Sequence, residues 1–169
     1  PIVEGLGLEV RGDFGLNVFN SRALAFLREL GLASATVSFE LRHQQVRDLA
    51  KLLPCEGIVY GRLPLMVMEN CITKNNVGCR HGAGSTLTDR TGAQFPVQCV
   101  YGCRNEIENS LPLFLADKAE WRGCGLTSAR LRFTTETADE CAAILRRYRG
   151  EGDYAPEKYT RGLFYRGVE

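Results

Sequence analysis

The chain has 169 residues, of which 44% are hydrophobic and 24% are charged. This length and composition predict a folded domain with its own core and exclude a disordered chain. The formal net charge of +1 excludes a strong overall field that would draw the protein to nucleic acid or membrane, and no apolar run approaches the roughly 20 residues of a membrane span.

Residues 1–69 alternate between strand-like and helix-like segments. Strands are predicted at residues 8–11, 15–19, 35–39, 57–61 and 65–68, and helices at residues 22–30 and 41–53. Ser21 is a suitable N-cap for the first helix, and Gly31 follows its end. Four apolar residues at helical spacing are expected on the buried face of this helix: Leu24, Phe26, Leu27 and Leu30.

These short apolar strands, separated by helices, predict parallel pairing through right-handed crossovers. The spacing suits a (β/α) barrel, which needs about 250 residues, so we interpret the chain as the later strands of such a domain. A doubly wound open sheet is the structural alternative. Because Pro1 stands where an initiator methionine would, we expect an N-terminal part of the same polypeptide to be missing.

Residues 70–117 interrupt this pattern and are rich in Gly, Asn, Thr and Cys. Residues 87–97 predict a β-hairpin that turns at Arg90-Thr91-Gly92. A final βα unit at residues 118–150 has a strand at 129–133 and a helix that Thr135 or Thr137 caps. The helix is expected to turn four residues inward: Ala138, Cys141, Ala142 and Leu145. A polar and aromatic tail follows at residues 151–169. The predicted class is α/β, the later strands of a (β/α) barrel-like domain with a cysteine-rich insertion.

The chain has seven cysteines, an odd and high number. Four of them lie close together in the sequence, with seven, nineteen and three residues between them: Cys71, Cys79, Cys99 and Cys103. Four thiolates can hold an iron–sulfur cluster or a structural zinc ion, and the spacing does not choose between them. Disulfides or buried apolar cysteines are the alternative. Three basic residues could offset the charge of a bound cluster: Lys74, Arg80 and Arg104. We interpret Cys55, Cys124 and Cys141 as structural.

Several segments, taken in order, resemble the collagenase-like peptidase family U32. They are residues 16–21, 38–41, 60–66, 87–90, 95–97, 109–113 and 160–168. The likeness covers nearly the whole chain. It implies a βα-barrel fold in which Cys71, Cys79, Cys99 and Cys103 hold a 4Fe–4S cluster, because these cysteines match those of the cluster-bearing members by order and context.

The resemblance also implies a function. Many family members are labelled proteases, whereas others hydroxylate a ribosomal-RNA cytidine, a tRNA uridine or the ubiquinone ring. The RNA-modifying members draw on prephenate, so RNA, a small carboxylate co-substrate and a cytoplasmic location are expected here. The tail and residues 16–20 look most like the large members that include the ribosomal-RNA hydroxylase. A collagenase-like peptidase and a zinc-stabilised scaffold without catalysis are the alternatives.

Hydrolase chemistry has little support in the sequence. Neither an H-E-x-x-H nor a G-x-S-x-G motif is present. The two histidines, His43 and His81, are expected in solvent, and nothing pairs either with a cysteine nucleophile. The sequence therefore favours oxidative chemistry.

Reacting groups of parallel barrels lie at the carboxyl ends of the strands. Five polar residues fall at or just past such ends: Asn17, Asn20, Glu40, Arg62 and Glu69. Arg62 is the candidate for a carboxylate of the co-substrate, because a guanidinium pairs with it bidentately. Glu40 is the candidate for proton transfer. Helix caps and loop salt bridges are the alternative roles.

Two basic segments bear on RNA binding. Arg146, Arg147 and Arg149 end the last helix, where cations also suit the helix dipole. The tail interleaves arginines with aromatic residues, which could hold phosphates and stack on bases. For the tail we favour a structural interpretation, in which it packs across the domain.

Overall fold

The computed structural model describes residues 7–78, 85–101 and 103–168, and for residues 73, 76 and 77 the backbone alone. The fold is mixed α/β, as predicted, with two sheets. The strands are β1 Arg11–Gly12, β2 Ser34–Thr36, β3 Cys55–Gly61, β4 Pro64–Met68, β5 Ser85–Thr88, β6 Gln94–Val100, β7 Arg104–Glu108, β8 Leu113–Phe114 and β9 Ser128–Arg132. The α-helices are α1 Ser21–Glu29, α2 His43–Leu49, α3 Ile72–Val77 and α4 Ala138–Arg149.

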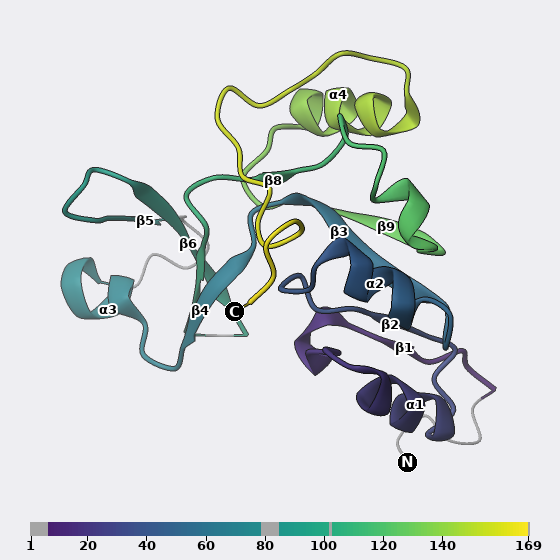
Figure 1. The fold of residues 1–169 in the computed structure, drawn as a ribbon. Helices are drawn as coiled ribbons and strands as arrows, with labels where there is room; N and C mark the ends of the chain where they lie inside the picture. Colours follow the sequence, from purple (N-terminus) through teal and green to yellow (C-terminus); the bar gives the residue numbers. More distant parts are fainter. Residues whose placement is uncertain (1–6, 79–84, 102, 169) are drawn as a thin grey trace.

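The first sheet confirms the predicted parallel pairing. Its parallel strands lie in the order β1, β2, β3 and β9, and β8 pairs antiparallel with the end of β3. Within the described ranges β1 and β9 each pair along one edge, so this sheet is open there. Its strands β1, β2 and β3 cross the right-hand part of Figure 1, with α4 above them.

Two apolar cores hold the first sheet to its helices. In one core, Leu24 of α1 and Val46 of α2 pack with Val37 and the completely buried Cys55. In the other, the α4 residues Ile144 and Tyr148 pack against β3 and β8. Cys55 and Cys124 are both buried, as expected of cysteines with a structural role.

The second sheet is antiparallel, in the order β4, β7, β6 and β5. With α3 it stands apart from the helices of the first sheet, on the left of Figure 1. The predicted hairpin is confirmed as β5 and β6. Asp89 shapes its turn, because one carboxylate oxygen accepts hydrogen bonds from the amides of Thr91 and Ala93 at 2.8 and 3.0 Å.

One glycine allows β3 to approach β9 closely. Gly61 has a φ of 118°, and a Cβ at this position would lie 2.0 Å from the carbonyl oxygen of Arg132. Any side chain would therefore force the two strands apart at the carboxyl edge of the parallel sheet.

Three details of the predicted elements are wrong. Residues 14–16 form a 3-10 helix where a strand was predicted, because Asp13 caps it and Asn17 ends it in the left-handed conformation. The N-cap of α1 is Asn20, whose Oδ1 accepts from the amide of Ala23 at 2.9 Å. The predicted buried face of α1 holds only in part, because Phe26 and Leu30 are 59% and 60% exposed.

The inward face of α4 also differs from the prediction. Of the two predicted caps, Thr135 and Thr137, it is Thr137 that caps the helix, in a capping box with Glu140. Ile144 and Tyr148 point inward, whereas Leu145 is 41% exposed and Cys141 is only half-buried. Tyr148 sets the rotation of the helix, because its hydroxyl donates to Val59 O at 2.6 Å and accepts from Leu115 N at 2.9 Å.

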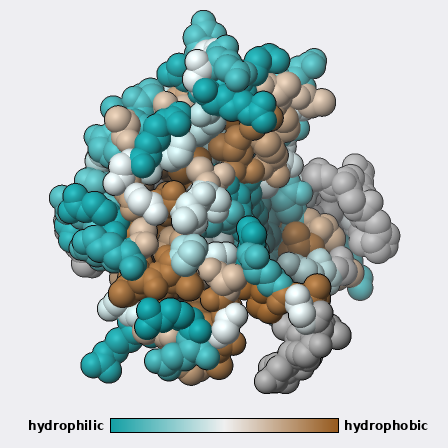
Figure 2. Space-filling model, turned by 90° about the vertical axis from the view of Figure 1, so that its right-hand side faces the viewer, coloured by the Kyte–Doolittle hydropathy of each residue, from teal (hydrophilic) through white to brown (hydrophobic). Residues whose placement is uncertain are grey.

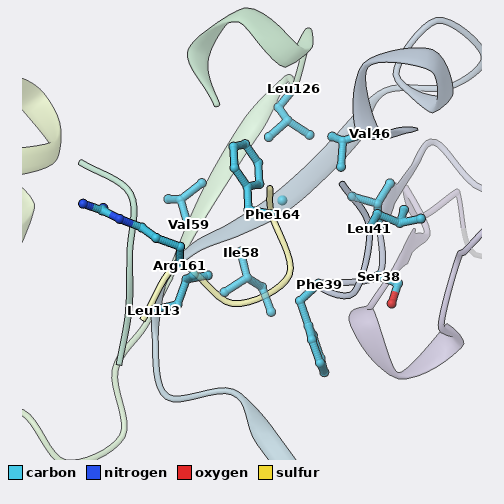
Figure 3. Close-up of a pocket in the computed structure, with 12 residues that line it drawn as sticks. Ser38, Phe39, Leu41, Val46, Ile58, Val59, Leu113, Leu126, Arg161 and Phe164 are labelled. Carbon is cyan, nitrogen blue, oxygen red and sulfur yellow. The ribbon is translucent and has the colours of Figure 1, made fainter. Parts of the chain in front are cut away.

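The C-terminal tail packs across the domain, as the favoured interpretation expected. Thr160 bridges to Leu113, Phe164 packs against both cores, and Arg161 donates to both carboxylate oxygens of Asp117. Phe164 points toward Leu126 beside a cavity of about 30 Å³, while Arg161 points away from it (Figure 3). A cavity of that volume has room for water but lies well below the size of ordinary ligand pockets.

The surface shows where apolar residues remain exposed. On the face drawn in Figure 2, hydrophobic residues gather mainly in the lower part, at the height of α1 in Figure 1. Among the described residues, none of the helices combines the length and the apolar character that a membrane span requires.

Candidate functional site

Cys71 lies between β4 and α3 and caps the helix. It is buried, and its sulfur accepts a hydrogen bond from the backbone amide of Lys74 at 3.3 Å. The first helical amide, that of Ile72, donates instead to the side-chain oxygen of Asn105 at 2.7 Å. This bond ties the Cys71 segment to β7.

Asn105 also stands beside a second predicted ligand. It is 1% exposed and pairs in register with Cys99 of β6. Residues that pair directly across an antiparallel ladder have their Cα atoms about 4.5–5.5 Å apart and project to the same face. Cys99 and the start of α3 therefore meet at Asn105, from opposite sides.

The third cysteine occupies the turn at the same end of the sheet. Val100 and Arg104 close the β6–β7 hairpin, and Cys103 directly precedes Arg104. Cys103 and Cys99 are both exposed. The fold thus brings three of the four predicted ligands, Cys71, Cys99 and Cys103, to one end of the antiparallel sheet.

The fourth predicted ligand, Cys79, lies outside the described residues, as do Arg80 and His81. In the part of the chain that is described, no three His, Cys, Asp or Glu side chains are grouped closely enough to hold a metal ion. Cys71 and Cys103 form no disulfide. The donors at this end are thiols, which suit iron–sulfur clusters and zinc, so the set fits such a group by its chemistry.

The charges around this end differ from the expectation. Arg104 was expected to offset the charge of a cluster, but it forms an ion pair with Glu69 at 2.9 Å. Both side chains are exposed, so the pair contributes little to stability. It accounts for Glu69, a predicted site residue, as one half of a loop salt bridge.

Arg62 follows β3 and lines a pocket of about 340 Å³ that also holds Tyr60, Tyr154 and Lys158. Its Nη1 donates to the carbonyl oxygens of Asn109, at 2.9 Å, and Ser110. Much of the guanidinium is thus used to hold the chain after β7. Only Nη2 lacks an acceptor among the described residues.

Glu40, the other predicted catalytic residue, lies in the turn that follows β2. Its backbone amide donates to Ser38 Oγ at 3.4 Å, and it does not line the Arg62 pocket. Asn17 and Asn20 serve as helix caps. The structure therefore does not bring the predicted polar residues together as one site.

Neither His43 nor the buried cysteines Cys55 and Cys124 are placed to act in nucleophilic catalysis. His43 is half-buried rather than solvated, since its ring lies 5.5 Å from that of Phe164, centre to centre. Burial raises the pKa of Cys55 to about 11 and also raises the pKa of Cys124. Both thiols stay protonated at neutral pH and are poor nucleophiles.

The sequence reasoning missed a charged cluster at the junction of the two sheets. Arg132, at the end of β9, pairs with Glu106 and Glu108 of β7. The alternation of acidic residues at 106 and 108 was the available signal, since alternate residues of a strand share a face.

The fold and the site define a mixed α/β protein whose antiparallel sheet gathers cysteines at one end. No family model, curated protein or solved structure matches the chain.

Proposed function

We propose that the chain belongs to an iron–sulfur protein of the U32 peptidase-like family that acts in the hydroxylation of RNA nucleosides. The observation that carries this proposal is the meeting of Cys71, Cys99 and Cys103 at one end of the antiparallel sheet. Cys79 follows α3 closely in the sequence and would supply the fourth thiolate.

The four cysteines would hold the cluster from three backbone segments. Cys71 would bind from the start of α3, Cys99 from β6 and Cys103 from the β6–β7 turn. Asn105 would keep the first of these segments against the other two. When bound, a cluster with four thiolate ligands supplies single-electron transfer rather than an open iron.

The same proposal places the parallel strands in a (β/α) barrel. It is supported by the order β1, β2, β3 and β9, by the parallel registers and by the helices packed beside them. Further strands from an N-terminal part of the polypeptide would complete such a barrel.

RNA as substrate rests on the family resemblance and on the chemistry of one surface. Arg146 and Arg149 are exposed at the end of α4, where they could contact phosphates. Arg161 is held by Asp117, so the tail offers less for RNA than its composition suggested. Arg62 and Lys158 share a pocket that could take a small carboxylate.

The test compares Cys99→Ala with Cys141→Ala in cells that lack the native gene. Cys141 is half-buried on α4 and lies outside the antiparallel sheet, so its loss is the matched control. We expect mass spectrometry of total RNA to show a hydroxylated nucleoside with wild type and Cys141→Ala but not with Cys99→Ala. Full modification with Cys99→Ala would overturn the proposal. Peptide cleavage that survives this substitution would favour the peptidase instead.

A further inference from the structure

The cluster at the junction of the sheets has an unusual charge balance. One guanidinium, that of Arg132, serves two carboxylates: its Nη1 donates to Glu108 at 2.8 Å and its Nη2 donates to Glu106. Nη1 also donates to the carbonyl oxygen of Arg62 at 2.6 Å. Among the described residues no other cation pairs with either glutamate.

Burial makes this imbalance costly. The Glu108 side chain is completely buried, and those of Glu106 and Arg132 are 13% and 17% exposed. Two ionised carboxylates beside one guanidinium would leave an uncompensated negative charge in a medium of low dielectric constant. Like charges that share a site do not both ionise readily, so one carboxylate keeps its proton.

The geometry indicates where that proton sits. Glu108 Oε2 accepts from Arg132, whereas Glu108 Oε1 is buried and has no hydrogen-bond partner among the described residues. An oxygen that receives no hydrogen bond does not stabilise negative charge, so this geometry favours the protonated form of Glu108. Burial raises the pKa of Glu108, and the negative charge of Glu106 raises it further, against the opposing effect of Arg132.

We infer that Glu106 and Glu108 share one proton at neutral pH, so that a buried neutral carboxylic acid lies beside Arg132 at the carboxyl edge of the parallel sheet. The groups that face Glu108 are Arg132 from β9 and Glu106 from its own strand, while its partner on β4 is the uncharged Pro64. The site lies where proteins with parallel βα sheets place their reacting groups, and it is distinct from the cysteines.

The first test is infrared spectroscopy of the full-length protein at neutral pH. We expect a carbonyl band of a protonated carboxylic acid that is absent from Glu108→Gln. The band should also vanish in Glu106→Gln, because a single remaining carboxylate balances Arg132 and ionises. Its absence from wild type would overturn the inference, and its persistence in Glu106→Gln would show a buried acid without a shared proton.

The second test is equilibrium unfolding of the same variants. Glutamine copies the shape and neutrality of a protonated glutamate and has no proton to lose on unfolding, so the unfolding constant of Glu108→Gln at neutral pH should be no higher than that of wild type. If both carboxylates were ionised, the variant would break a buried pair, and the constant would rise about 100-fold or more. A rise of that size, or a failure to fold, would contradict the inference.

The pH dependence of stability provides a further comparison. A carboxyl whose pKa is raised by folding stabilises the fold below its ordinary pKa, and this contribution is lost as the pH rises through the raised value. Wild type should therefore lose stability relative to Glu108→Gln as the pH increases above about 4–5. A constant difference between the two across this range would count against a shared proton.

Discussion

Replacement of Asn105 by alanine should loosen the cysteine-bearing end of the antiparallel sheet. The side chain is 1% exposed, and its oxygen is the acceptor for the Ile72 amide at 2.7 Å. Asn105→Ala leaves this amide without its partner, which costs about 1–3 kcal/mol. The docking of the Cys71 segment against β7 should therefore weaken by about 5- to 150-fold, since 1.4 kcal/mol is a factor of ten.

The assay is the rate at which anaerobically purified protein releases iron to a chelator. Asn105→Ala should release iron about 5- to 150-fold faster than wild type, although every cysteine is retained. Asn109→Ala is the matched control, because it removes a similar bond, to the Leu111 amide at 3.1 Å, away from the cysteines. Equal release by all three proteins would refute the role given to Asn105.

Two further predictions concern stability. Tyr148→Phe should lower the free energy of unfolding, measured by denaturant titration, by about 1–3 kcal/mol, because the buried Leu115 amide loses its acceptor. The control Tyr165→Phe, nearer the surface, should change this free energy far less. Hydrogen bonds from Arg161 lower the pKa of Asp117, so this pair stabilises the fold above the ordinary aspartate pKa and the contribution is lost as the pH falls through the lowered value. The pair is partly exposed, so Asp117→Asn should cost under about 1 kcal/mol at neutral pH and nothing once the pH is well below about 4; a cost that persists in acid would contradict this reasoning.

Local signals in the sequence predicted several elements well. The β5–β6 hairpin follows from the turn chemistry around Asp89, and the start of α4 follows from the capping box of Thr137 and Glu140. The positions of the cysteines in neighbouring loops predicted that they would lie close together. The role of Asn105, which connects the Cys71 segment to Cys99, was not predicted. Its role depends on strand register, which the sequence does not show.

Tertiary contacts decided the remaining features. The rotation of α4 depends on the Tyr148 hydroxyl, which bridges β3 and the segment after β8. Arg62 looked like a ligand-binding residue, but the segment after β7 returns to accept most of its hydrogen bonds. Glu106 and Glu108 were not singled out from the sequence, because only the tertiary position of Arg132 places them at a buried junction.

We propose that the four cysteines together hold an iron–sulfur cluster. Mössbauer spectroscopy of the full-length protein, purified anaerobically from cells grown on ⁵⁷Fe, tests it most directly. We expect the spectrum of a 4Fe–4S cluster with all irons bound by sulfur, retained in Cys141→Ala and lost in Cys99→Ala. A colourless protein that contains zinc or no metal would contradict it.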